Sequence, residues 1–405
     1  MAATARDWLS AKEATRILGV KVQTLYAYAS RGLLTSVPGL RGRGRRYSAG
    51  DVATLKNRHD ARAGHGAVAA SALRWGEPVL ETRISEVRAD GPRYRGHSAL
   101  DLVRQGASFE QVSELLFSGN LPTSELRWDE LRAVEVRSVP RFTMPEQPMP
   151  GLATLLSLLA LAPGLSTPLP DELEHERARA ILLFLASSLR DVRRCESTSR
   201  RVAERMLEAY EVLPRPQAVR IVDRALTLCA DHELNASTFA ARVAASTGAS
   251  LCASLAAAMH TLSGPRHGGA CARVEALLEE ASAQRKANDV VTARLTRGEA
   301  LPGFGHPLYP QGDPRARELL TLADEVKRPP APHLRMRALI ASASHAGQPA
   351  PTLDAGLVAI ASALGMPHGA ASAIFAIGRI AGWVTHILEQ RAQATILRPR
   401  ARYVG

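Results

Sequence analysis

The sequence predicts a mainly α protein, in which a large helical body follows a small helix-turn-helix module. The chain has 405 residues, which is enough for two or three domains with a sizeable core. Alanine, leucine and arginine dominate, whereas Phe, Tyr and Trp together make up 4%, and this mixture favours helices. Residues 9–55 differ from the rest, because two short helical patterns there precede a basic, glycine-rich string.

The first two helices of the module are predicted from their end signals. Ser10 stands three residues before Glu13, a capping box in which the serine caps the helix and the glutamate reaches back. Gly19 is expected to end this helix, and a second helix is expected over residues 23–30. The predicted order is therefore helix, short turn, helix.

A basic hairpin and a further helix complete the module. The string Arg41–Tyr47 contains four arginines and two glycines, and Ser48–Asp51 is expected to open the next helix. This order resembles the winged helix-turn-helix domains of the MerR and excisionase type. Residues 1–62 contain twelve Lys and Arg against four Asp and Glu, so they carry +8 of the chain's net +12.

The positive charge and the resemblance together indicate binding to double-stranded DNA. In such a domain the start of the second helix faces base edges, and the arginines of the wing contact phosphates. The residues expected at this interface are Gln23, Thr24, Tyr26, Arg41, Arg43, Arg45 and Arg46. A module that binds only protein, in a chain rich in arginine by composition, is the alternative interpretation.

The body is expected to be helical and to contain no metal site. Apolar residues recur there at helical spacing. One such set is Ala178, Ile181, Leu182 and Leu185. The four cysteines form no CxxC pair, which argues against a zinc site or a disulfide framework and for a reducing cytoplasm. The apolar run 152–161 is too short for the ~20 residues that cross a bilayer, so we expect no membrane segment.

Four separated strings in the body carry most of the information about function. His232 lies in ADHELNAST at 230–238, and His267 lies in GPRHGGA at 264–270. His306 ends GFGH, which leads on to Asp313-Pro314-Arg315, and Asp354 follows before LGMP at 364–367. These strings, in this order, resemble the citrate synthase family. The resemblance extends from about residue 75 to the C-terminus.

The resemblance implies an Si-type citrate synthase, which joins acetyl-CoA to oxaloacetate and releases citrate and CoA. This chemistry removes a weakly acidic methyl proton from a thioester, so it needs a carboxylate base and two hydrogen-bond donors. By resemblance, Asp354 is the base, His267 donates to the thioester oxygen and His306 donates to the carbonyl of oxaloacetate. Acetyl-CoA is then a co-substrate, and no permanently bound cofactor is implied.

The resemblance also implies the residues that hold oxaloacetate. The two carboxylates of this substrate suit arginine, whose planar guanidinium binds a carboxylate through two hydrogen bonds. Arg315 and Arg379 match family positions, and His232 would complete the pocket, although a buried histidine can also be a plain core residue. Arg398 matches an arginine that reaches the neighbouring subunit's site in the family. We therefore expect a homodimer with shared active sites.

Several positions depart from the family pattern, among them Thr352, Leu353 and Ala355 around the base, where the family commonly has Asn-Val-Asp-Phe. Pro307 and Pro310 stand where the family often has basic residues that serve the phosphates of CoA, and Cys271 replaces a frequent asparagine. The change at Cys271 is interpreted as a packing change. The two prolines favour a second hypothesis, in which the body is a weakly active or inactive metabolite sensor of a transcription regulator, whereas the intact His267, His306 and Asp354 argue for an enzyme. A third is a 2-methylcitrate synthase that uses propionyl-CoA, because one methylene changes binding by only ~1 to 3 kcal/mol.

The family organisation implies five segments. Residues 1–58 form the helix-turn-helix domain and 59–75 a linker. Residues 76–267 and 364–405 form a large domain, and 268–363 form a small domain inserted into it. Residues of the site would then lie on both sides of a cleft that closes over the substrates.

Overall fold

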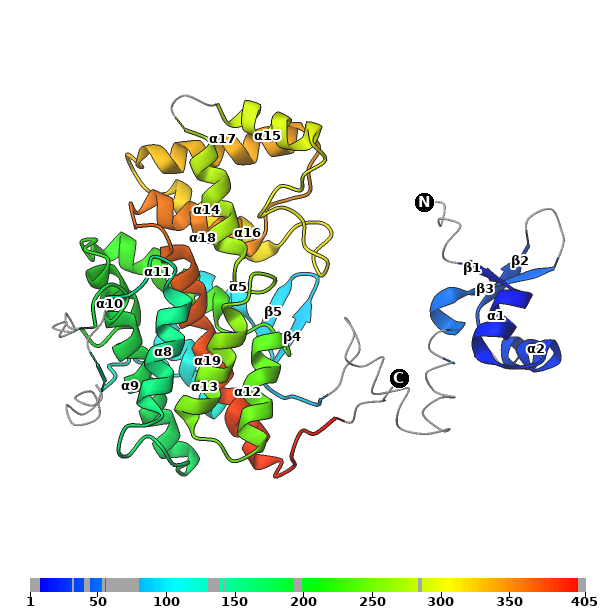
Figure 1. Cartoon of the computed structure of the whole chain (residues 1–405), viewed down its shortest axis with the longest axis horizontal. Coiled ribbons are helices and arrows are strands. Elements are labelled where there is room, and N and C mark those ends of the chain that lie inside the picture. Colours follow the sequence, from blue (N-terminus) through cyan, green and yellow to red (C-terminus); the bar gives the residue numbers. More distant parts are fainter. Residues whose placement is uncertain are drawn as a thin grey trace. The chain divides into compact units, whose positions relative to one another are not determined.

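The structure, a computed structural model, describes residues 8–30, 33–39, 44–52, 55, 80–129, 139–140, 143–192, 199–282 and 286–399. The chain divides into two compact units (Figure 1). The N-terminal unit comprises Met1–Glu81 with Arg398–Gly405, and the main unit comprises Thr82–Leu397. The predicted linker 59–75 and the predicted DNA contacts Arg41 and Arg43 lie outside the described residues.

The helices of the N-terminal unit begin and end where the sequence indicated. Helix α1 spans Ala11–Leu18 and α2 spans Val22–Ser30. The capping box is confirmed, because the Ser10 amide donates to Glu13 Oε2 at 2.8 Å and the Glu13 amide donates to Ser10 Oγ at 3.3 Å. Gly19 caps α1 with φ 67°, a left-handed conformation that suits glycine.

The predicted hairpin is part of a three-stranded antiparallel sheet. Strands β2 (Ser36–Pro38) and β3 (Arg45–Ser48) pair, with Pro38 opposite Arg45. The third strand, β1 (Trp8–Ser10), pairs with the other edge of β3 and was not predicted. Tyr47 in the central strand is buried and joins a small core whose other members are Ala14, Leu18, Leu25, Leu34 and Val52.

The main unit opens with a second antiparallel sheet, which corrects the expectation of an entirely helical body. Its strands, in the order β4-β5-β6, are Ser85–Arg88, Gly91–Tyr94 and His97–Ser98. Gly91, at φ 116°, follows Asp90 of the turn and is the first residue of β5. Asp-Gly is a hairpin signal, and the strands themselves are too short for a clear period-two pattern.

Helices form the rest of the main unit, and their bounds are as follows. They are α5 (Ala99–Arg104), α6 (Phe109–Ser118), α8 (Pro148–Leu159), α9 (Asp171–Ser187), α10 (Val202–Ala209), α11 (Pro216–Cys229), α12 (Ala236–Ser246), α13 (Leu251–Leu262), α14 (Ala270–Glu280), α15 (Ala287–Thr296), α16 (Pro314–Asp324), α17 (Ala331–His345), α18 (Leu353–Ala363) and α19 (Ala370–Ala392).

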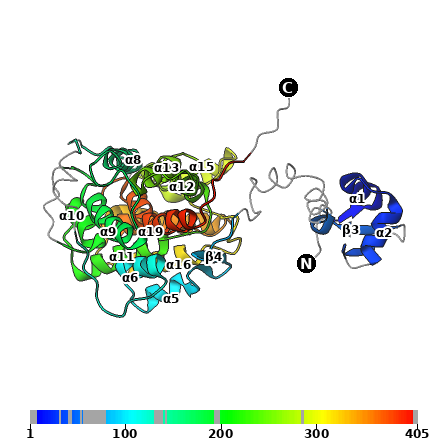
Figure 2. The same cartoon turned by 90° about the horizontal axis from the view of Figure 1, so that it is seen from below.

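Helix α19 is the central element of the main unit. Seen along the unit in Figure 2, it lies in the middle of the larger group of helices, and α9, α11, α12 and α13 pack against it. Its length and apolar composition would suffice to cross a membrane, but 94% of its most apolar window is buried inside the unit. A helix that is apolar all round and buried by its neighbours is a core helix.

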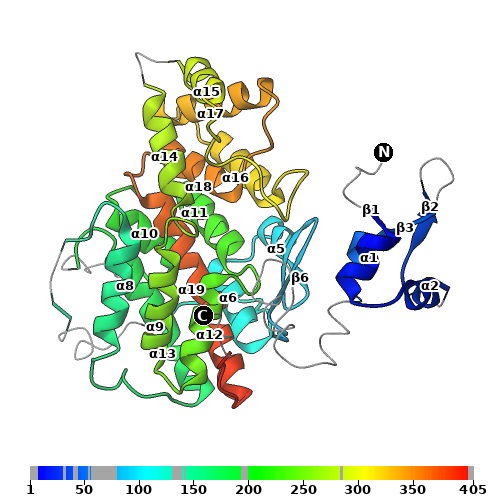
Figure 3. The same cartoon turned by 45° about the vertical axis from the view of Figure 1, so that its right-hand side comes forward.

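Helices α14 to α18 gather at one end of the main unit, above the group around α19 (Figures 1 and 3). Helix α16 packs on α18, α15 packs on α17, and α18 also contacts α19. These five helices correspond to the predicted small domain 268–363. Because both groups belong to one compact unit, the domain boundaries at 267 and 364 stay a prediction.

Candidate active site

His267 lies in a tight turn between α13 and α14. The His267 amide donates to Gly264 O at 2.9 Å, and the Gly268 amide donates back to Leu262 O at 2.8 Å. A Cβ at position 268 would collide with Leu262 O, so this close return of the chain requires glycine. The turn therefore explains why this histidine is followed by glycine.

His267 is neutral, and its contacts indicate which ring nitrogen carries the proton. Burial, followed by the charge of Arg379, lowers the pKa of His267 to about 4. The Ser237 amide donates to His267 Nε2 at 3.4 Å, and Ser237 Oγ lies 2.8 Å from the same atom. Since a backbone amide can only donate, Nε2 is the acceptor and we assign the proton to Nδ1. His267 can thus offer Nδ1–H to a substrate oxygen.

Asp354 is brought to the site by a short pairing of two loops. Residues 303–305 run beside 350–352, where the Gly305 amide donates to Ala350 O at 2.9 Å and the Thr352 amide donates to Gly303 O at 2.8 Å. Helix α18 begins directly afterwards, and Asp354 lies in its first turn without capping it. The pairing holds the segment that leads to His306 beside the start of α18.

The Asp354 carboxylate is held by neutral donors. Oδ1 accepts the thiol of Cys271 at 3.4 Å, and Oδ2 accepts the hydroxyl of Thr352 at 3.3 Å. Among the described residues, no Lys, Arg or His forms an ion pair with Asp354. Both oxygens of the carboxylate therefore contact only neutral groups, an arrangement in which no cation competes for the position of a substrate proton.

His306 is a second neutral histidine with a defined proton. The Leu308 amide donates to His306 Nδ1 at 3.1 Å, so the proton of the neutral ring is assigned to Nε2. Burial lowers the pKa of His306, and the charge of Arg315 lowers it further, while the carboxylates of Asp313 and Asp354 act in the opposite direction. His306 therefore presents Nε2–H as a donor.

His232 lies beside His306, and Tyr309 joins them. The ring centroids of the two histidines are 6.2 Å apart, and His232 Nε2 lies 3.0 Å from the Tyr309 hydroxyl. Burial and then Arg315 lower the pKa of His232 well below its ordinary value. Burial raises the pKa of the Tyr309 hydroxyl to about 12, so it stays protonated. Tyr309 was not among the predicted site residues.

Arg315 is buried at the site but already has a carboxylate partner. Its guanidinium donates to Asp313 from Nε at 3.1 Å and from Nη2 at 2.8 Å. Burial would lower the pKa of Arg315, but the Asp313 carboxylate raises it above its ordinary value. The Arg315 guanidinium also lies 5.5 Å from the centre of the Tyr309 ring. Arg315 therefore supports Tyr309 and shares its charge with Asp313.

Arg379 is the buried arginine that retains donors for a substrate. It lies on α19 between Gly378 and Gly382, is 2% exposed, and donates from Nε to Cys229 O at 2.8 Å. Among the described residues no carboxylate forms an ion pair with it, and burial lowers its pKa. A buried guanidinium without a partner anion is a ready site for a carboxylate.

Arg398 does not belong to the compact main unit that contains this site. It follows Leu397, the last residue of the main unit, and its side chain is exposed. Its role at a partner's site stays a prediction. In the part of the chain that the structure describes, no three His, Cys, Asp or Glu side chains form a group suited to a metal ion.

Five of the predicted DNA contacts lie in the part of the N-terminal unit that the structure describes, and they differ in exposure. Gln23 and Tyr26 of α2 are exposed, Thr24 is half-buried, and Arg45 is exposed. Arg46 donates from Nη2 to Trp8 O at 2.8 Å, a bond that ties β3 to β1. Arg45 is thus the better placed of the two for a phosphate.

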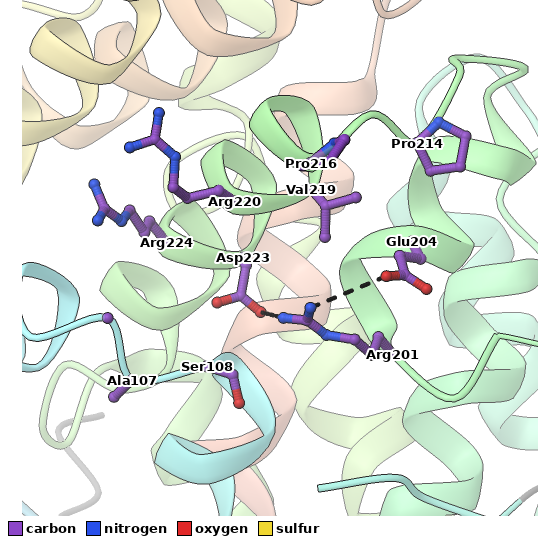
Figure 4. A pocket seen from close by; sticks show the side chains of 11 residues that line it. Ala107, Ser108, Arg201, Glu204, Pro214, Pro216, Val219, Arg220, Asp223 and Arg224 are labelled. Carbon is purple, nitrogen blue, oxygen red and sulfur yellow. Dashed lines mark hydrogen bonds and ion pairs between the residues drawn. The ribbon is translucent and has the colours of Figure 1, made fainter. Parts of the chain in front are cut away.

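A cavity of about 400 Å³ lies elsewhere in the main unit (Figure 4). None of the site residues lines it. Arg201 crosses it and forms ion pairs with Asp223 at 3.3 Å and with Glu204 at 4.0 Å. Arg220 and Arg224 line it as well, but the predicted base and the predicted imidazole donors do not, so we do not assign the predicted chemistry to this cavity.

Comparison with known proteins decides the family. Residues 72–400 match the family described as "Citrate synthase, C-terminal domain". The chain belongs to the citrate synthase family. A helix-turn-helix domain family matches residues 8–60, so the chain is a citrate synthase-like acyltransferase with an N-terminal helix-turn-helix domain. Both resemblances predicted from the sequence are confirmed.

Individual relatives agree with this assignment. "Citrate synthase 2" of Bacillus subtilis is 30% identical over 366 residues, covering 83% of this chain and 96% of its own length. "2-methylcitrate synthase" of Shewanella oneidensis is 29% identical over 351 residues, covering 82% and 93%. The citrate synthase structure from Thermoplasma acidophilum, with carboxymethyl coenzyme A and oxaloacetate, has a TM-score of 0.66 at 24% identity and covers 81% and 94%. The predicted fold class is thereby confirmed.

Proposed function

We propose that this protein condenses acetyl-CoA with oxaloacetate in the cytoplasm and releases citrate and CoA. The observation that carries the proposal is the hydrogen bonding of three residues, Asp354, His267 and His306. Asp354 accepts only neutral donors, and the two histidines are neutral, each with one assigned N–H. This set supplies one base and two donors.

In the proposed reaction, Asp354 removes a methyl proton of acetyl-CoA while His267 Nδ1–H donates to the thioester oxygen, where the enolate charge develops. The methyl carbon then forms a bond to the carbonyl carbon of oxaloacetate. His306 Nε2–H donates to the carbonyl oxygen, which gains the electron pair and takes up a proton to become the hydroxyl group of the product. Water finally cleaves the thioester, so that citrate and the CoA thiol leave. Neutral imidazoles suit these steps, because a buried imidazolium would cost desolvation free energy.

Oxaloacetate is proposed to bind between Arg379 and the His232–Tyr309 pair. The unpaired guanidinium of Arg379 supports this assignment, since it can donate to one substrate carboxylate through two hydrogen bonds. Arg315 is proposed to make a weaker contact with oxaloacetate than Arg379 does, because the charge of Arg315 is already shared with Asp313. Arg398 of the second subunit is proposed to complete the site in a homodimer.

Propionyl-CoA is the second candidate substrate. The similarity to a 2-methylcitrate synthase is nearly as high as that to a citrate synthase, 29% against 30% identity, so identity does not separate the two activities. The two thioesters differ by one methylene beside the reacting carbon, and the space around it decides which one is preferred. Such a methylene changes the free energy of binding by only ~1 to 3 kcal/mol. Turnover with each thioester has to be compared directly.

The test measures release of free thiol from acetyl-CoA or propionyl-CoA in the presence of oxaloacetate. Asp354→Ala should reduce kcat at least ~10²-fold, because the proton acceptor is removed. Asp289→Ala is the matched control, since Asp289 is an exposed aspartate in the first turn of α15. Full turnover by Asp354→Ala would exclude it as the base, and no thiol release from the intact protein would favour the metabolite-sensor hypothesis.

We further propose that the N-terminal unit binds double-stranded DNA. The helix-turn-helix match, the exposed side chains of Gln23, Tyr26 and Arg45, and the net +8 of residues 1–62 support this assignment. A domain that recognises another protein through the same surface is the alternative.

A further inference from the structure

A buried cysteine, Cys271, contacts the carboxylate of the proposed base, Asp354. Cys271 is the second residue of α14, four residues after His267, and its side chain is 1% exposed. Its sulfur lies 3.4 Å from Asp354 Oδ1. The other carboxylate oxygen, Oδ2, accepts the Thr352 hydroxyl at 3.3 Å. Each oxygen of Asp354 thus has one neutral donor.

The thiol is a donor, not a second anion. Burial raises the pKa of Cys271 well above its ordinary value, and the nearby Asp354 carboxylate raises it further. The sulfur therefore keeps its proton and points it at Oδ1. A thiol S–H is a weaker hydrogen-bond donor than a hydroxyl or an amide.

The strength of this donor matters for a base. A hydrogen bond to the charged form of a carboxylate stabilises that form and makes the carboxylate less basic. An amide or hydroxyl at position 271 would fix the orientation of Asp354 but would also weaken it as a proton acceptor. A thiol of similar size fixes the orientation at a smaller loss of basicity.

We propose that Cys271 is a positioning residue, whose thiol donates to Asp354 Oδ1 and holds the carboxylate in place while leaving it a stronger base than a hydroxyl or amide neighbour would. This inference rests on the proposed function, since it assigns Asp354 as the base that Cys271 serves. It explains why a buried polar contact here uses sulfur.

The experiment compares Cys271→Ser, Cys271→Ala and the unchanged protein by titration of the Asp354 carboxyl group. The readout is the pH-dependent infrared band of carboxylic acids, in which the contribution of Asp354 is the part that disappears in Asp354→Asn. The Asp354 pKa should follow the order Ala, Cys, Ser from highest to lowest. This readout requires no turnover, so it tests the contact independently of the enzymatic activity.

The kinetic readout is the acid limb of kcat/KM against pH, which should move in the same order. We expect kcat to fall in both variants by roughly 3- to 10-fold. Serine should make Asp354 a weaker base, whereas alanine should leave the Asp354 carboxylate free to rotate. Both decreases in kcat are smaller than the ~10²-fold decrease expected when the base itself is removed. Cys252→Ala, a change at a buried cysteine of α13, is the control and should leave the limb in place.

The outcomes separate the two claims. Equal Asp354 pKa values in the three proteins, with folding verified by thermal unfolding, would overturn the role of Cys271 and leave it a packing residue. The expected order without any turnover in the unchanged protein would support the contact and overturn the proposed function. A purely structural cysteine would lower the unfolding temperature in Cys271→Ala and move neither pH profile.

Discussion

At the scale of single residues, the site combines cationic arginines with neutral histidines. Burial and the charges of Arg315 and Arg379 lower the pKa of His232, His267 and His306. The arginines therefore help to keep the imidazoles uncharged, in addition to the contacts with an anionic substrate that we propose for them. A neutral imidazole with one acceptor nitrogen fixed by a backbone amide offers a donor that does not need to be reoriented during the reaction.

The depressed histidine pKa values predict a loss of stability in acid. An unfolded histidine titrates near 6.5, whereas His267 in the folded protein titrates at about 4. Between these values the unfolded chain binds more protons, so the free energy of unfolding should fall as the pH is lowered from about 6.5 toward 4. Urea unfolding at several pH values measures this slope. His232 and His306 should add to it, since their pKa values are lowered too.

A substitution isolates the part due to His267. His267→Gln should make the fall in unfolding free energy between pH 6.5 and 4 shallower. His345→Gln is the control, because His345 is exposed on α17 and should leave the slope as it was. Identical slopes for His267→Gln and the unchanged protein would show that the folded state does not keep this histidine neutral.

The candidate site residues that the sequence proposed are those with a local signal. His267 and His306 were proposed because glycines surround them, and these glycines permit the tight turns that the structure shows. Tyr309 had no such signal, since its contact with His232 joins residues 77 positions apart. The spacing of Asp313 and Arg315 is compatible with an ion pair between them. Whether this ion pair takes the place of a contact with the substrate depends on how deeply the two side chains are buried, and the tertiary fold determines that burial.

At the scale of elements, the crossing of α11 and α19 positions Arg379, the arginine that we propose to bind oxaloacetate. The end of α11 lies so close to α19 that the Gly382 amide donates to Ala230 O at 3.0 Å. A Cβ at Gly378 would lie 2.7 Å from Leu226 O, and one at Gly382 would collide with Asp231. Arg379 lies between the two glycines and reaches Cys229 O across the crossing. The spacing of the glycines thus sets the place of Arg379.

This crossing predicts that Gly382→Ala destabilises the main unit. The added methyl group would strike the Asp231 carboxylate and Ala230 O, so overpacking should cost about 1 to 3 kcal/mol. Because Arg379 would shift with α19, the KM for oxaloacetate should rise as well. Thermal unfolding and initial rates check both effects. Gly50→Ala, where only ordinary contact with Ser48 is met, should leave the unfolding of the main unit unchanged.

The elements that the sequence revealed are those with strong periodicity or end signals. The set beginning with Ala178 falls in α9, and the capping box begins α1. Strands β1 and β4 were missed because each is only three or four residues long, and a strand becomes recognisable through its partners. Pairing of β1 with β3 joins residues about forty positions apart, which no local pattern encodes.

At the scale of the whole molecule, the proposed dimer predicts complementation between two inactive variants. Asp354→Ala removes the base, and Arg398→Ala removes the arginine proposed to act in the partner's site. A mixed dimer would contain one site with neither change. Equal mixing of the refolded chains should therefore restore about a quarter of the activity, since half of the dimers are mixed and half of their sites are intact. Mixed dimers that form, as shown by copurification of two tags, yet stay inactive would place Arg398 outside the partner's site.

The second prediction at this scale is that the helix-turn-helix unit binds DNA separately from catalysis. It has its own small core around Tyr47 and Leu25, so removal of residues 1–62 should leave thiol release nearly unchanged. The full-length protein should bind a library of genomic DNA fragments, and its affinity should fall steeply with salt as counterions are released. Fluorescence anisotropy at several salt concentrations measures that slope.

Substitution of arginines in the wing tests whether these side chains cause the salt dependence of DNA binding. Changing Arg41, Arg43 and Arg45 to Ala should flatten the slope by about one unit for each phosphate that the protein no longer neutralises. Arg46 is left in place because its bond to Trp8 O supports the sheet. Arg88→Ala, at an exposed arginine of β4 in the main unit, is the control and should not alter the slope. If full-length protein shows no binding at any salt and truncation abolishes thiol release, the basic unit supports the enzyme by protein contact and its charge does not serve DNA.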